Sequence, residues 1–146
     1  MAESKKKFLD FSKEAVPYFE ALKEALHGSE KPSPTNGEIF ILCMAYGFSN
    51  GNRVELKSKS GTGPRVEYFS REQDLLMASV QLATTGNAAN LGDTEERYLI
   101  AEEFAEGGAI LLAQELRSQG DFQLDFASRI YVKALDKAAP EIEEED

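Results

Sequence analysis

The sequence predicts a mainly α-helical fold, with about five helices around a central apolar helix and one small β-hairpin. Three observations predict this fold class. Apolar residues recur at helical spacing over most of the chain, and three capping-box signatures mark helix starts. Only residues 53–68 alternate polar and apolar side chains as strands do, which is too little strand for an α/β sheet.

The size and composition of the chain indicate one domain, expected over residues 1–140. A chain of 146 residues with 42% hydrophobic content can bury one sizeable core without a disulfide or a metal. The last six residues, 141–146, hold five acids and are expected to form a disordered tail.

The first helix is predicted over residues 16–27. Pro17 suits its first turn, where a backbone N–H has no partner. Phe19 and Leu22 begin an apolar face at helical spacing, and Gly28 ends the helix.

The central helix is predicted over residues 39–48, a run of ten uncharged residues. Thr35 and Glu38 just before it have capping-box spacing, and a helix that is apolar on all sides packs on several sides. A buried strand is the alternative, because Ile-Phe-Ile-Leu-Cys also suits a sheet; the capping box and the length favour the helix. The single cysteine, Cys43, is expected to be a small buried hydrophobe.

A two-stranded hairpin is predicted over residues 53–68, with a tip around Gly61 and Gly63. Alternation along its strands predicts one face toward the core and one toward water. The side chains expected to face the core are Val54, Leu56, Val66 and Tyr68.

Three helices are predicted after the hairpin. Ser70 and Gln73 start the first, whose apolar stripe is expected to be Leu76, Val80 and Ala83, with Leu75 and Leu82 at its shoulders.

The second of these helices starts at a third capping box, Asp93 and Glu96, and runs to about Ser118. Gly107 and Gly108 in its middle predict a close helix contact or a kink, since each glycine costs near 1 kcal/mol relative to alanine. The third helix is predicted over residues 121–137.

The charge of the chain is strongly acidic and uneven. A net charge of −10 opposes nonspecific nucleic-acid binding by the whole surface, yet residues 51–71 carry five basic residues against two acidic ones. On a projecting hairpin these cations could contact phosphate or a protein partner; the alternative is that they block pairing at a sheet edge. The candidate nucleic-acid or partner contacts are Arg53, Lys57, Lys59, Arg65 and Arg71.

The residue types needed for most enzyme chemistry are scarce. With one histidine, His27, and one cysteine, the chain cannot build a zinc site or a Cys-His or Ser-His-Asp triad, and Gly61-Thr62-Gly63 is too short for a phosphate loop. No catalytic residue, metal site or cofactor is therefore expected. The carboxylates of the predicted helix 93–118 could bind a hard cation or form a solvated face, the simpler interpretation. These carboxylates are Glu95, Glu96, Glu102, Glu103 and Glu106.

Neither the N-terminal residues nor the apolar run predicts membrane insertion. The stretch Phe-Leu-Asp-Phe that follows the N-terminal lysines is too short and too polar to be the apolar region of a signal peptide. The apolar run over residues 39–48 is far short of the roughly 20 residues that span a bilayer. We therefore expect a soluble, cytoplasmic protein.

Three segments resemble a known family: residues 47–53 (Gly-Phe-Ser-Asn-Gly-Asn-Arg), 69–71 (Phe-Ser-Arg) and 104–108 (Phe-Ala-Glu-Gly-Gly). Over about residues 38–116 the chain is similar to the small accessory proteins of DNA phosphorothioation (dnd-type) gene clusters, the DNA phosphorothioation-associated protein 4 family. The resemblance implies a prokaryotic cytoplasmic protein linked to phage defence by sulfur-modified DNA. It supplies no reaction and no active site.

Three functions follow as hypotheses. The first is a non-enzymatic accessory or regulatory protein of such a modification or restriction system, which binds another protein of that system by charge complementarity. The second is a DNA-binding regulator that uses the hairpin as a wing. The third is a metal-dependent hydrolase that uses Glu102, Glu103 and Glu106. A homo-oligomer is compatible with the sequence.

Overall fold

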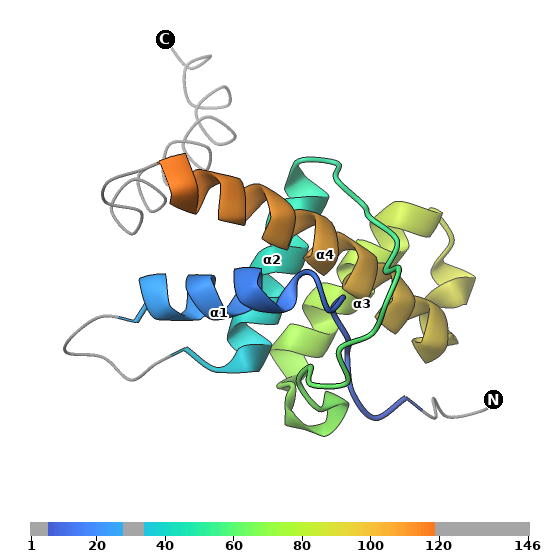
Figure 1. Ribbon diagram of the computed structural model, residues 1–146. Helices are drawn as coiled ribbons and strands as arrows, with labels where there is room; N and C mark the ends of the chain where they lie inside the picture. The colour runs from blue at the N-terminus through green and yellow to red at the C-terminus, as the bar shows by residue number, and fades with distance from the viewer. Residues whose placement is uncertain (1–5, 28–33, 119–146) are drawn as a thin grey trace, which may run out of the picture.

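The computed structural model describes residues 6–27 and 34–118, and this part of the chain is mainly helical (Figure 1). The predicted helix over residues 121–137 and the acidic tail at 141–146 lie outside the described residues. The helices are α1 (Val16–Ala25), α2 (Asn36–Ser49), α3 (Arg71–Thr85) and α4 (Thr94–Ser118), with two 3-10 helices, η1 (Val66–Tyr68) and η2 (Ala88–Gly92).

Helix α2 is the predicted central helix, and it begins three residues earlier than expected. Both hydrogen bonds of its capping box form: the Glu38 backbone N–H donates to Thr35 Oγ1 (3.1 Å) and the Thr35 N–H donates to Glu38 Oε1 (2.9 Å). Phe40, Cys43 and Met44 are buried. The helix, not the alternative strand, is therefore confirmed.

Glycines allow α2 and α4 to pack with their backbones in contact. A Cβ on Gly108 would overlap the Cys43 carbonyl oxygen, and one on Gly47 would overlap the Phe104 carbonyl oxygen. Gly107 lies equally close to the Asn52 carbonyl. The close helix contact predicted at Gly107 and Gly108 is confirmed.

Helix α3 begins at the predicted capping box, and Val80 of its predicted apolar stripe is buried, but Leu76 and Ala83 are exposed. Leu76 is 50% exposed, whereas Met77 and Gln81 are buried. Gln81 turns inward because its side-chain amide donates to the backbone oxygens of Asn90 and Asp93, at 2.8 and 3.0 Å. The turn at η2 therefore folds back over the face of α3 that carries Gln81, and the leucines are left outside.

The predicted hairpin at residues 53–68 is also wrong. Residues 53–65 form an extended segment, which we call the strap, and residues 66–68 form η1. Figure 1 shows the strap in green, running from the end of α2 across α4. The Val54 backbone N–H donates to the Glu103 carbonyl on α4 at 3.0 Å. Tyr68, expected in the core, is 77% exposed.

The N-terminal segment, residues 6–15, takes the backbone partners that a hairpin would have used. The Leu9 N–H donates to the Pro64 carbonyl (2.9 Å) and the Ser60 N–H to the Phe11 carbonyl (3.0 Å). Phe8 and Arg65 form an isolated antiparallel bridge. Buried backbone groups need hydrogen-bond partners. The strap finds them in the N-terminal segment, about fifty residues away in the sequence, and not in a neighbouring strand of a hairpin.

Within residues 6–27 and 34–118, the structure has no helix that is both long and apolar enough to cross a bilayer.

Candidate functional site

A groove of about 600 Å³ lies between the strap, the N-terminal segment and the first turns of α4. The strap contributes Glu55, Leu56 and Lys59, and α4 contributes one face of its first three turns. Six carboxylates and two lysines line the groove, which gives its lining a net charge of −4. We call it the acidic groove; it is lined by Lys6, Glu55, Leu56, Lys59, Asp93, Glu95, Glu96, Leu99, Glu102 and Glu103.

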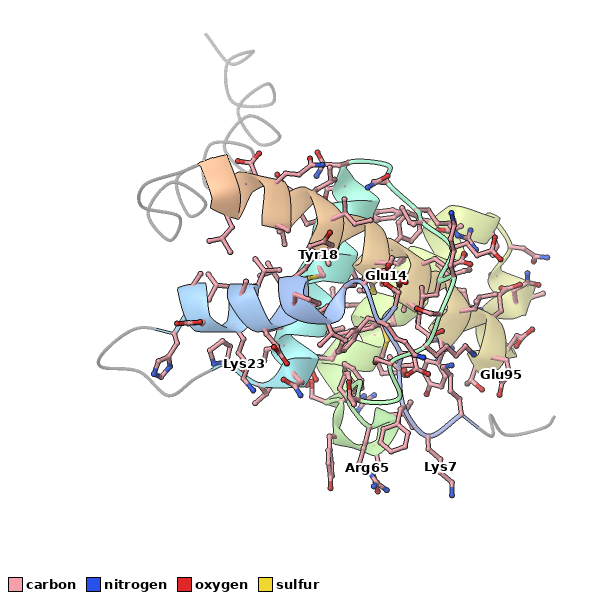
Figure 2. The ribbon with its side chains drawn as sticks, viewed as in Figure 1. Lys7, Glu14, Tyr18, Lys23, Arg65 and Glu95 are labelled. Atoms are coloured by element: carbon pink, nitrogen blue, oxygen red, sulfur yellow. The ribbon has the colours of Figure 1, made fainter. Side chains whose placement is uncertain are left out.

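Two leucines give this acidic groove an apolar component. Leu99 on α4 is 51% exposed, and Leu56 on the strap is half-buried. Glu55 and Glu95, from the same two elements, are exposed. The label in Figure 2 places Glu95 toward the N-terminal end of α4. An apolar surface with exposed carboxylates suits a ligand that carries both apolar groups and cations.

Glu102 is the most buried carboxylate of the groove, with its residue 3% exposed. It accepts the Asp10 backbone N–H at 2.5 Å and pairs with the Lys6 ammonium at 2.9 Å. Burial raises the pKa of Glu102 above its ordinary value, and the Asp10 N–H and Lys6 offset part of that rise. Glu102 therefore fixes the N-terminal segment to α4.

Glu103 and Glu106 are also engaged within the fold. Arg53 Nε donates to Glu103 Oε1 at 2.6 Å, with its guanidinium 5.8 Å from the centre of the Phe104 ring. Glu106 is buried and accepts both the N–H and the hydroxyl of Ser12. The interpretation of these carboxylates as a solvated helix face is wrong for Glu102 and Glu106. In the part of the chain that the structure describes, no three His, Cys, Asp or Glu residues are grouped to hold a metal ion.

The five basic candidates do not form one surface. Arg53 is paired with Glu103 beside the groove, and Lys59 lines the groove. Lys57 is exposed on the strap, and Arg71 is exposed at the first position of α3.

Arg65 lies elsewhere, where the strap meets the N-terminal segment. Its Nε pairs with Glu67 Oε1 at 2.5 Å, and its guanidinium lies 5.4 Å from the centre of the Phe8 ring and 5.8 Å from that of Tyr68. Figure 2 shows Arg65 and Lys7 projecting from the same edge of the molecule.

The groove itself was not predicted from the sequence. Its acids on α4 were recognised, but Glu55 and Leu56 come from the predicted hairpin and Lys6 from the segment before the first predicted helix, and no prediction brought these segments to α4. Only their convergence on α4 produces the site, and no local pattern encodes it.

Comparison with known proteins identifies the family. The family model described as DNA sulphur modification system-associated protein 4 matches residues 12–146. Neither the curated proteins nor the solved structures gave a significant match. The match includes α1 to α4 and covers nearly the whole chain, and it confirms the family resemblance described above. The chain belongs to the DNA sulphur modification system-associated protein 4 family.

Proposed function

We propose that the chain is a non-enzymatic accessory protein of a prokaryotic DNA sulphur modification and restriction system, and that it acts by binding another protein of that system. The acidic groove is the docking site. Its partner presents a basic segment with at least one apolar side chain.

The observation that carries this proposal is the combination of charge and apolar surface in the groove. Lys6, Lys59 and Arg53, which pairs with Glu103, balance only part of the charge of the six carboxylates, and Leu99 offers an apolar contact among them. A basic segment would replace unfavourable proximity of like charges by opposite-charge pairs, which gives specificity and a fast association. Family membership supplies the system in which that partner is sought.

DNA binding by the basic segment has less support. Arg53 and Arg65 each pair with a carboxylate of their own chain, so contact with phosphate would require them to exchange partners. The segment also lacks the projecting hairpin that a wing requires.

A metal-dependent hydrolase has less support as well. Glu102, Glu103 and Glu106 each accept hydrogen bonds from groups of the same chain. Those bonds hold the N-terminal segment and the strap, so their carboxylates already serve a structural purpose.

The test is a tagged pull-down from the native host, with and without nuclease, followed by mass spectrometry. The wild-type chain is compared with the charge-reversed variant Glu55→Lys/Glu95→Lys. A matched control, Glu20→Lys/Glu24→Lys, makes the same charge change at exposed positions of α1.

We expect wild type and control to retain a protein encoded by the same modification genes after nuclease treatment, and the groove variant to lose most of it. The purified pair should then bind in a salt-dependent way. Equal retention by the groove variant would overturn the assignment of the groove. Retention of DNA alone, released by nuclease, would favour the DNA-binding regulator instead.

A further inference from the structure

A second cavity, of about 250 Å³, lies between α1, the beginning of α2, the N-terminal segment and the strap. None of the residues that line it lines the acidic groove. Its walls include the buried side chains of Phe11, Phe19 and Ile39, and the rings of Phe11 and Phe19 stack with their centres 4.1 Å apart. The inner part of this cavity therefore suits an apolar group.

Helix α1 turns a face of mixed character toward the cavity. Val16, Phe19, Glu20 and Lys23 all line it, and their spacing places them on one side of the helix. A helix face that only packs against a core carries apolar residues at such positions, but two of these four are charged. Figure 2 shows Lys23 on the side of α1 that faces the beginning of α2.

The two charges at this cavity are not used within the fold. Lys23 Nζ donates to Asn36 Oδ1 at 3.1 Å, which is a neutral acceptor, and an ammonium group has three donors. Glu20 and Lys23 are three residues apart, close enough to pair on a helix. Within residues 6–27 and 34–118, however, neither makes an ion pair. The rim therefore offers one ammonium and one carboxylate beside an apolar wall.

We infer that this cavity binds a free α-amino acid with an apolar side chain. The ligand's carboxylate pairs with Lys23, its ammonium pairs with Glu20, and its side chain enters the cavity beside the Phe11 ring. An apolar anion would bring a like charge toward Glu20, and an apolar cation would do the same toward Lys23. A ligand that carries both charges at one end and an apolar group at the other complements the whole lining.

The size of the cavity limits the ligand further. Its volume of about 250 Å³ lies below the roughly 300–1,000 Å³ of pockets that take drug-sized molecules. A single amino acid is therefore a better match than a peptide, which also lacks the two charges on one carbon atom. Glu20 is exposed, so solvent screens its ion pair. The dissociation constant is accordingly expected on the order of 10 μM to 1 mM.

Titration of the full chain with L-phenylalanine, followed by chemical-shift changes in NMR spectra, tests this inference. Binding should saturate, and two analogues show which charge matters. Phenylpropionate lacks the ammonium and phenethylamine lacks the carboxylate, so each should bind about tenfold more weakly. Glycine, which has no side chain to fill the cavity, should not bind measurably. The absence of saturable shifts with L-phenylalanine, or equal affinity for both analogues and the amino acid, would overturn the inference.

Two variants assign the charges to residues. Lys23→Met should bind L-phenylalanine about tenfold more weakly and lose the preference for it over phenethylamine. Glu20→Gln should lose the preference over phenylpropionate instead. A change that only disturbed the fold would weaken all three ligands together, so the exchange of preferences identifies direct contact.

The matched controls are Lys13→Met and Glu24→Gln, the same changes at exposed residues that do not line the cavity. Both should bind L-phenylalanine like wild type, and variants of Glu20 and Lys23 that did the same would contradict the site. The inference is independent of the acidic groove. Glu20→Lys/Glu24→Lys, which should retain the partner protein there, should no longer bind the amino acid here.

Discussion

Glu106 on α4 holds Ser12 of the N-terminal segment with two hydrogen bonds in the protein interior. The Ser12 backbone N–H donates to Glu106 Oε1 at 3.1 Å, and its hydroxyl donates to Oε2 at 2.5 Å. Both residues are buried, at 6% and 2% exposure. One turn earlier, Glu102 accepts the Asp10 N–H. The backbone N–H groups of the N-terminal segment thus donate to side-chain carboxylates of α4. In a β-sheet, such groups would donate to the backbone carbonyls of a neighbouring strand.

Replacing Glu106 by alanine should destabilise the protein markedly. The change leaves two donors of Ser12 buried without acceptors, which is expected to cost about 2–4 kcal/mol. Glu106→Gln keeps an acceptor oxygen and should lose clearly less. Urea unfolding followed by circular dichroism measures both. Gln114→Ala, an exposed change on the same helix, should stay within about 0.5 kcal/mol of wild type; a Glu106→Ala value in that range would contradict the structural role.

Gly108→Ala should be among the most damaging single substitutions in the chain. Alanine favours a helix by about 1 kcal/mol over glycine, but here the new methyl group would overlap the Cys43 carbonyl of α2. Forcing the helices apart is expected to cost more than about 3 kcal/mol. The free energy of unfolding, or loss of soluble protein, reports this.

Gly86→Ala is the matched control for that substitution. Gly86 has φ +68° and open space around its added Cβ, so alanine should cost only about 1–2 kcal/mol of backbone strain. If the two variants were equally stable, the helix contact would not be as close as the structure shows.

Short sequence patterns predicted α1 to α4. The conformation of the strap and the burial of two carboxylates depend on residues far away in the sequence. The capping box of Thr35 and Glu38 is complete within four residues, so α2 could be found from the sequence. The hairpin could not be judged locally, because the strap takes its partners from residues 7–11 and from α4. Glu102 and Glu106 looked like surface acids, since their donors lie 92 and 94 residues away.

Cys43 should be unreactive in the folded protein. It is fully buried against α4, and burial raises the pKa of its thiol, so the nucleophilic thiolate is scarce. Labelling with a thiol reagent should therefore proceed only as fast as the protein opens, and denaturant should accelerate it by several orders of magnitude. The exposed thiol of Ser79→Cys serves as an internal reference for a fast reaction. Comparable rates at the two positions in native buffer would show that α2 and α4 separate readily.

Glu102 should make stability depend on pH in a direction opposite to that of an ordinary salt-bridged acid. Its folded-state pKa is raised above the ordinary 4.5, mainly by burial. The folded chain therefore binds this proton more tightly than the unfolded chain does. The stabilisation that this proton gives is present below the ordinary pKa and is lost as pH rises through the raised one.

The variant Glu102→Gln lacks this titration but keeps an acceptor for the Asp10 N–H. Its free energy of unfolding relative to wild type should accordingly rise as the pH increases from below the ordinary pKa of 4.5 through the raised pKa of Glu102. Urea unfolding at several pH values measures the difference, with Glu24→Gln as the control for loss of one exposed negative charge. A relative stability that falls over the same range would mean that Lys6 and the Asp10 N–H outweigh burial, and that the ionised carboxylate is the favoured form at this site.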